Sequence, residues 1–173
     1  MRVLHDKKLL SFFAILILSG CSAVQQVPIS QDFDPTQTAW SEIDGKEQLI
    51  GSALLRTRGG DVRTCAGNDV HLIPRSAYSE ARMAIIYGNT FRGYVGVLET
   101  KRTPATTDPR FVKTVRSSKC DAQGNFEFNK IPSGSYYVMT SIFWQAGSSS
   151  QGGMLMSEVS VKASEKNRLI LTF

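Results

Sequence analysis

The chain has 173 residues, a formal net charge of +5 at pH 7 and an apolar content of 42%. This length suits one domain of ordinary size, and the apolar content excludes an intrinsically disordered protein. A mild positive charge also excludes the strongly basic surface of a typical nucleic-acid-binding domain, so no nucleic acid is predicted as a partner.

The N-terminus has the form of an export signal. Three cations within the first eight residues precede an almost wholly apolar stretch, residues 9–18, which is too short to span a bilayer with ease. The sequence Leu-Ser-Gly-Cys follows at 18–21. It resembles the lipobox of bacterial lipoproteins, which implies a lipoprotein signal peptide over residues 1–20 and a lipidated Cys21. An ordinary cleaved signal with a cysteine at its edge is the alternative.

The lipobox resemblance implies a membrane partner and a location. In that family the cysteine receives a diacylglycerol on its thiol and a further acyl chain on its amine, and each buried CH₂ contributes about 0.8 kcal/mol to anchoring. Ser22 differs from the aspartate of inner-membrane retention signals, so we expect a lipid anchor in the outer membrane, with the domain facing the periplasm or the surface. Residues 1–20 carry three cations and one anion, so their removal lowers the net charge to +3.

Two cysteines remain once Cys21 is lipidated. An even pair in an exported chain predicts a disulfide between Cys65 and Cys120, closing a long loop. Two reduced, buried thiols are the alternative.

Residues 21–47 are polar and lack apolar periodicity, which predicts a flexible tether, with Trp40 docking on the domain edge. Residues 48–58 form the first predicted strand of a domain that spans residues 48–173. Gly51 within this strand suggests a bulge or a close backbone approach. A short strand follows at residues 70–73.

One helix is predicted in the domain, at residues 76–88, with Ser79 as its capping residue. A strand fragment at residues 94–98 and a loop follow it. Residues 111–118 alternate in polarity and predict a strand that leads into Cys120.

The C-terminal third predicts four more strands. They cover residues 125–128, 136–144, 155–161 and 169–173. The second of these is apolar on both faces and is expected to be buried on both sides, and Phe173 is expected to close the core at the end of the last. Short strands with turn signals at regular spacing predict an all-β sandwich of about seven strands with one short helix inserted.

A motif in this third resembles a known family. Its first half is Asp121-x-x-Gly124-x-Phe126-x-Phe128, and its second half is Ile131-Pro132-x-Gly134-x-Tyr136-x-Val138. Together they resemble the carboxypeptidase regulatory-like domain, which implies a transthyretin-like, Greek-key β-sandwich. The long segment between Pro74 and Phe111 and the cysteine pair depart from that pattern. These domains accompany zinc carboxypeptidases but do not hold the zinc.

No catalytic or metal-binding motif is present, and neither a catalytic residue, a metal nor another cofactor is predicted. His71 is the one histidine outside the signal peptide, and one histidine cannot build a His₂Glu zinc site. Cys65 and His71 are close in sequence and could form a thiol nucleophile with its base, but a disulfide would forbid this. His71 is predicted to face solvent or the sheet edge.

Two sets of side chains are candidates for binding, and for both a structural role is the alternative. A basic run could contact anionic head groups or phosphates, unless it is only a solvated face: Lys101, Arg102, Arg110, Lys113, Arg116 and Lys119. An aromatic set could offer a sugar platform, although core packing is favoured for all but Trp144: Tyr136, Tyr137, Phe143 and Trp144.

These patterns predict a lipid-anchored, non-catalytic structural or binding module of the cell envelope, with an unidentified envelope protein or glycan as partner. An assembly subunit of an envelope secretion machine is a second hypothesis, because the outer-membrane lipoprotein of type VI secretion has a similar architecture. An enzyme with an unrecognised site is a third, and it requires Asp61, Asp69 or Glu99 to gather around His71.

Overall fold

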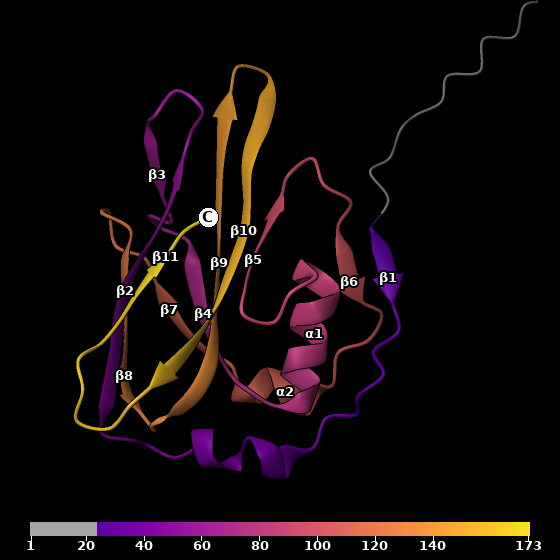
Figure 1. Ribbon diagram of the computed structural model, residues 1–173, viewed down its shortest axis with the longest axis vertical. Helices are drawn as coiled ribbons and strands as arrows, with labels where there is room; N and C mark the ends of the chain where they lie inside the picture. Colours follow the sequence, from indigo (N-terminus) through magenta and orange to yellow (C-terminus); the bar gives the residue numbers. More distant parts are fainter. Residues whose placement is uncertain (1–23) are drawn as a thin grey trace, which may run out of the picture.

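The computed structural model describes residues 24–173 (Figure 1). The predicted signal peptide and the predicted lipidation at Cys21 lie outside the described residues. The strands are β1 (Gln25–Val27), β2 (Glu47–Arg56), β3 (Val62–Thr64), β4 (Asp69–Pro74), β5 (Arg92–Gly96), β6 (Arg102–Pro104), β7 (Arg116–Lys119), β8 (Asn125–Ile131), β9 (Gly134–Ala146), β10 (Ser149–Val161) and β11 (Asn167–Leu171). The helices are α1 (Ala77–Tyr87) and α2 (Pro109–Thr114), with 3₁₀ turns η1 (Pro35–Gln37) and η2 (Ala39–Ser41).

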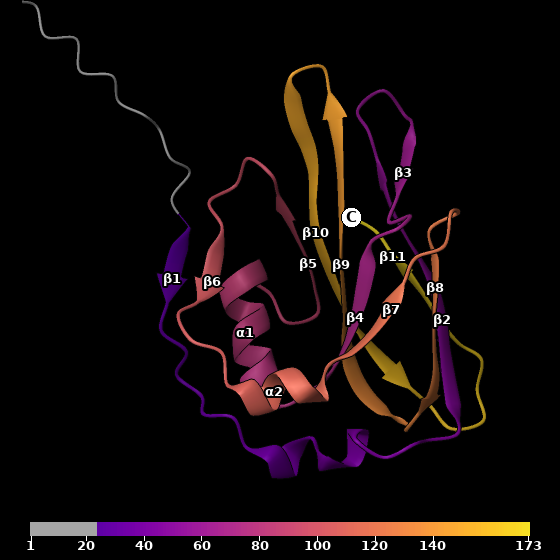
Figure 2. The ribbon, with the colours of Figure 1, turned by 180° about the vertical axis from the view of Figure 1, so that it is seen from behind.

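Two sheets pack face to face, and the predicted all-β sandwich is confirmed. The first sheet has five strands in the order β5-β10-β9-β4-β7, all antiparallel. In the second, β2 pairs in parallel with β11 and antiparallel with β8 and β3. Figure 2 shows the first sheet between the second sheet and the helices, with the short β1–β6 pair on the far side.

The core between the sheets is formed by the alternating side chains that the sequence predicts. Phe126 and Phe128 of β8 are 3% and 4% exposed and face Leu49 of β2 and Tyr136 of β9 within one cluster. Gly51 lies against Phe126, because a Cβ at this position would meet the Phe126 ring at 2.4 Å. The predicted close approach at Gly51 is therefore confirmed.

The Asp121 turn has the predicted geometry. Its carboxylate accepts hydrogen bonds from the backbone N–H groups of Gln123 at 2.9 Å and Asn125 at 2.8 Å. Gly124 has a φ of +86°, which a side chain rarely adopts. Turn and core residues of the motif thus determine the fold.

The predicted disulfide joins Cys65 to Cys120, with 5.8 Å between their Cα atoms and a sequence separation of 55. Cys65 follows β3 in the second sheet and precedes β4 in the first. Cys120 likewise lies between β7 of the first sheet and β8 of the second. The bond therefore ties together two crossings between the sheets.

A second hydrophobic cluster covers the outer face of the first sheet. Phe33, Tyr78 of α1 and Phe111 of α2 pack edge to face, with ring centroids 5.1–6.0 Å apart. They lie over Tyr137 of β9, which is fully buried. Strand β9 is therefore buried on both faces in its first half, as predicted.

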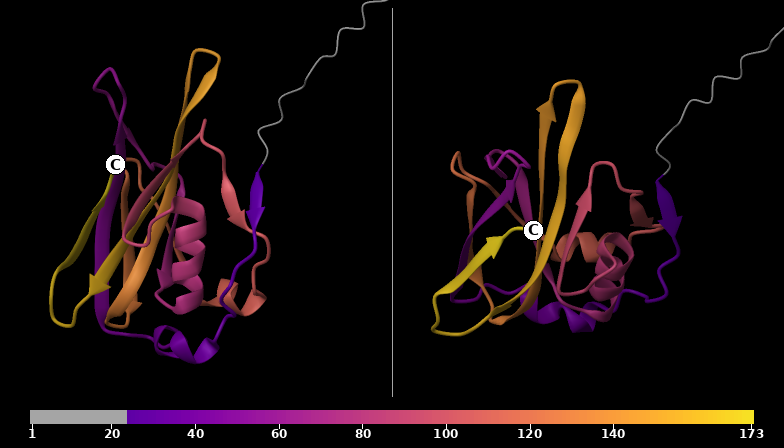
Figure 3. Two further views of the ribbon diagram at one scale, coloured as in Figure 1. Left: turned by 45° about the vertical axis from the view of Figure 1, so that its right-hand side comes forward. Right: turned by 45° about the horizontal axis from the view of Figure 1, so that its top comes forward.

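The N-terminal segment, predicted as a flexible tether over residues 21–47, contacts the domain from Gln25 onward, where β1 pairs with β6. Phe33 is 5% exposed, and Trp40 contacts Tyr136 with ring centroids 5.1 Å apart, which confirms the docking of Trp40. Figure 3 shows this segment running beneath the sandwich to reach β2. A few apolar residues are enough to hold this segment on the domain, because they pack between side chains of elements that are distant in the sequence.

Three local predictions differ from the structure. The capping residue of α1 is Ser76, whose side chain accepts from the backbone N–H of Ser79. Residues 109–114 form helix α2, because Asp108 and Pro109 start a helix ahead of the expected strand. Phe173 is 67% exposed and stacks on Tyr94 instead of closing the core.

Candidate functional site

A groove of about 650 Å³ lies over β2, β8 and β11 of the second sheet. The groove is lined on one face of the sheet because side chains alternate between the two faces along each strand. Leu49, Ala53 and Phe128 point into the core, so the residues between them point outward. The side chains and backbone that line the groove are Ile50, Gly51, Ser52, Ser118, Lys119, Asp121, Asn125, Phe126, Glu127, Arg168, Leu169 and Ile170.

Planar polar groups are held in a fixed arrangement beside the groove. The Gln48 amide donates to the Glu127 carboxylate at 3.0 Å and to the Asn129 side-chain oxygen at 2.9 Å. The Asn129 amide also donates to Glu127. These bonds orient Glu127 from β2 and β8 together, and its second carboxylate oxygen remains available as an acceptor.

Charges of both signs line the same groove. Hydrogen bonds from Asn125 hold the pKa of Asp121 below its ordinary value. Lys119 donates to Asp69 at 2.8 Å, and this bond holds the pKa of Asp69 low. Arg168 is exposed and makes no ion pair within the described part of the chain. The groove therefore offers a free guanidinium near ionised carboxylates, with Ile170 as an apolar surface.

The structure divides the predicted basic run between two places: Arg110, Lys113 and Arg116 line one pocket near Phe33 and Glu42, and Lys119 lies apart from them. Arg110 pairs with Asp108 at 2.7 Å, and Arg116 donates to the carbonyls of Ser41, Ile43 and Lys130. Both side chains thus have structural partners. Lys119 is the member that lines the groove.

The predicted aromatic set does not form a platform. Tyr136 and Tyr137 are buried in opposite clusters. Trp144 packs partly against the core, and Phe143 is 47% exposed. The two rings that could contact a ligand thus lie on the β9–β10 hairpin, away from the groove residues.

His71 belongs to a different pocket, over the outer face of the first sheet. Its Nδ1 lies 3.0 Å from the Ser117 hydroxyl, and Asp69 lines the same pocket, whereas Asp61 and Glu99 do not. The disulfide removes Cys65 as a nucleophile. Among residues 24–173, no three or more His, Cys, Asp or Glu side chains are grouped as metal ligands.

Among the groove residues, the sequence identified only Lys119 as a candidate for binding. The signal was present as the polar half of the alternation in β8, where Asn125, Glu127 and Asn129 separate the core residues. The alternation in β8 does not show which strands complete the groove. Strand β11, which pairs with β2, comes from the far end of the chain. Within the described residues, no helix is long and apolar enough to cross a membrane.

The chain is similar to a solved structure, that of a "putative carbohydrate binding protein" from Pseudomonas aeruginosa. The two share 25% sequence identity and a TM-score of 0.70, over 83% of this chain and 99% of the other. No family model matches the chain, and no curated protein matches its sequence.

Proposed function

We propose that this protein is a non-catalytic carbohydrate-binding module, held in the bacterial outer membrane through acylated Cys21, with an envelope glycan as its partner. The observation that carries the proposal is the groove on the second sheet, in which fixed planar acceptors and a free guanidinium lie beside apolar side chains. The similarity to a protein named for carbohydrate binding supports the same class of ligand.

The groove suits the chemistry of a sugar. Hydroxyl groups donate and accept at once, so they pair with carboxylates, amides and guanidinium groups that are already oriented. Glu127 and Asn125 supply acceptors and an amide donor, and Arg168 supplies donors. Ile50 and Ile170 offer the aliphatic surface against which the C–H face of a sugar ring packs.

The position of the predicted anchor supports this use of the groove. Only three residues separate Cys21 from Gln25 at the start of β1, a reach of roughly 10 Å in extended chain. Strands β1 and β6 lie on the side of the molecule opposite β2, β8 and β11 (Figures 1 and 2). An anchor at Cys21 would hold the β1–β6 side near the bilayer and leave the groove facing away.

The sequence motif supports a binding role for the fold. A carboxypeptidase regulatory-like domain is an accessory module. The motif residues from Asp121 to Val138 form turns and core here, so groove residues outside the motif positions, such as Glu127 and Arg168, are free to differ between such modules. We therefore include membership in that family in the proposal.

The test is binding of the soluble Cys21→Ser protein to purified envelope glycans, namely peptidoglycan fragments and lipopolysaccharide oligosaccharides, by calorimetry. Glu127→Ala and Arg168→Ala should each weaken the affinity for the bound glycan by about tenfold or more. Glu165→Ala and Arg56→Ala are matched controls, since they remove exposed charges outside the groove and should leave the affinity unchanged.

Two results would overturn the proposal. If neither glycan class binds and crosslinking in cells captures only proteins, the assembly-subunit hypothesis replaces it. If the controls weaken binding as much as the groove variants, the groove is not the site. The anchor is tested separately, because Cys21→Ser should move the protein from the membrane fraction to the soluble fraction.

A further inference from the structure

A row of side chains with opposite charges at its two ends crosses the groove on the second sheet. Ile50 of β2 is the direct cross-strand neighbour of Glu127 on β8 and of Arg168 on β11. All of them line the groove. Neighbouring strands are about 4.8 Å apart, so the Cβ atoms of Glu127 and Arg168 are separated by roughly 10 Å. An apolar side chain therefore lies between a carboxylate and a guanidinium.

The next row along the strands extends the two sides of the groove. Ser52 of β2 is the neighbour of Asn125 on β8 and of Ile170 on β11. The β8 side thus presents the Glu127 carboxylate and the Asn125 amide, and the β11 side presents a guanidinium and the Ile170 side chain. The sign of the charge therefore changes across the strands of the groove.

Hydrogen bonds fix the orientation of the Glu127 carboxylate. The Gln48 amide, at 3.0 Å, and the Asn129 amide both donate to the same oxygen, Oε1. The other oxygen, Oε2, takes part in neither bond, and no cation pairs with Glu127 among the residues that the structure describes. An ammonium group of a ligand can therefore donate to Oε2.

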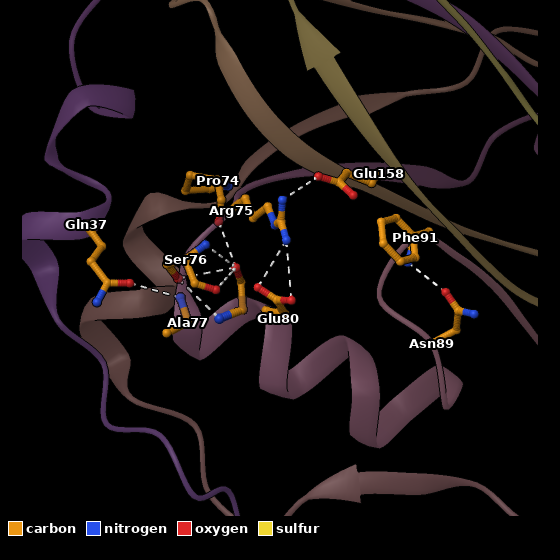
Figure 4. A network of polar contacts seen from close by, with 10 residues as sticks. Gln37, Pro74, Arg75, Ser76, Ala77, Glu80, Asn89, Phe91 and Glu158 are labelled. Carbon is orange, nitrogen blue, oxygen red and sulfur yellow. Dashed lines mark hydrogen bonds and ion pairs between the residues drawn. The ribbon is translucent and has the colours of Figure 1, made fainter.

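The guanidinium of Arg168 differs from that of Arg75 on the other sheet. Figure 4 shows Arg75 between two carboxylates, with Glu158 at 3.0 Å and Glu80 at 3.3 Å. Arg168 makes no ion pair within residues 24–173, although the Glu127 carboxylate is only two strands away. Its planar fork of donors is therefore available for a carboxylate of a ligand.

The two other charged groups of the groove already have protein partners. Lys119 donates to the Asp69 carboxylate at 2.8 Å. The Asp121 carboxylate accepts from two backbone N–H groups of its own turn and from a side-chain amide. Glu127 and Arg168 are therefore the charges with which a ligand can pair.

We infer that the groove binds a zwitterionic glycan, an inference that rests on the proposed glycan-binding function. The glycan carries a protonated amine and a carboxylate within roughly 10 Å of each other, which is the separation of the two charged residues. The amine donates to Glu127, the carboxylate accepts from Arg168, and the C–H face of the sugar packs on Ile50. A neutral sugar would leave both charges unpaired, and a purely acidic sugar would be repelled by Glu127.

The test is calorimetry of the soluble Cys21→Ser protein with a peptidoglycan disaccharide that bears a short peptide, because this fragment carries a free amine and carboxylates. Two derivatives isolate the charges: in one the amine is acetylated, and in the other the carboxylates are amidated. We expect the parent protein to bind the intact fragment about fivefold more tightly than either derivative.

Two variants that remove one charge each assign the preferences to their residues. Glu127→Gln keeps the oxygen that accepts from Gln48, so this variant should stay folded and bind the intact and acetylated fragments equally. Arg168→Gln should bind the intact and amidated fragments equally. Each variant should retain the preference that depends on the other residue.

The matched controls are Glu165→Gln and Arg56→Gln, which remove exposed charges outside the groove and should keep both preferences. A circular dichroism spectrum equal to that of the parent checks the fold of every variant. If both groove variants also keep both preferences, the charges are recognised elsewhere and the inference is wrong.

The ligand panel separates a failure of this inference from a failure of the glycan proposal. Equal binding of all three fragments by the parent would overturn the inference and leave glycan binding in place. Binding of a lipopolysaccharide oligosaccharide alone would do the same. If the free peptide binds as tightly as the intact fragment, or if no glycan binds, both the inference and the glycan proposal are wrong.

Discussion

The two hydrophobic clusters on either side of the first sheet are built in different ways. The inner core between the sheets draws on strands with regular alternation and is closed by a disulfide. The outer cluster draws on Phe33, Tyr78 and Phe111, which come from three segments far apart in the chain. Strand β9 serves both, since Tyr136 points into the inner core and Tyr137 into the outer cluster. A sandwich can thus carry a second core once an insertion covers one of its outer faces.

The two outer faces differ accordingly. Helices α1 and α2 pack on part of the outer face of the first sheet, whereas the outer face of the second sheet carries an open groove with both polar and apolar lining. The outer face of the first sheet holds the pocket lined by His71 and Tyr87, and the outer face of the second sheet holds the groove.

Of the changes that distinguish the two clusters, removing the disulfide of the inner core should lower the free energy of unfolding most. Cys65→Ala with Cys120→Ala frees a loop of 55 residues and should lower the free energy of unfolding by about 4 kcal/mol. Urea unfolding of the variant against the parent measures this. A loss below about 1 kcal/mol would mean that the inner core alone holds the two crossings together.

Shortening the Phe33 side chain should weaken the outer cluster more than the inner core. Phe33→Ala should cost about 3 kcal/mol, because the side chain is buried between two aromatic rings. Hydrogen exchange should rise in α1 and β1 more than in β2 and β8. Phe126→Ala in the inner core is the matched variant, and in it hydrogen exchange should rise in all of these elements. Equal increases in α1 and β8 for Phe33→Ala would mean that both clusters unfold as one unit.

The smallest effects on stability should come from removing the hydroxyl groups of the tyrosine pair of β9, and only one of the two substitutions should lower stability. The Tyr136 hydroxyl donates to the Pro132 carbonyl at 2.9 Å, so Tyr136→Phe should lower stability by about 1 kcal/mol. The Tyr137 hydroxyl is buried without a hydrogen-bond partner among the described residues. Tyr137→Phe should therefore leave stability unchanged or raise it by up to ~1 kcal/mol. Denaturant midpoints of the two variants compare them directly, and a loss for Tyr137→Phe equal to that of Tyr136→Phe would contradict this difference.

The sequence predicted the inner core well, because its signals are local. Alternation at Phe126 and Phe128 needs only a pleated strand with one buried face, and the Asp121 turn needs only its own backbone. The disulfide followed from the even number of cysteines that remain after the predicted signal peptide and from the predicted export. The same reasoning failed at Phe173, because alternation continues past the point where the last strand leaves the sheet.

The sequence by itself determined the sandwich, its turns and the partners of its disulfide, since each depends on neighbours a few residues away or on a count. Only the tertiary structure decided the second core and the groove. Glu127 and Arg168 line one groove because β2 pairs with both β8 and β11, which places them on either side of Ile50. Strand order is set by burial of whole faces, and no local pattern in this chain encodes it.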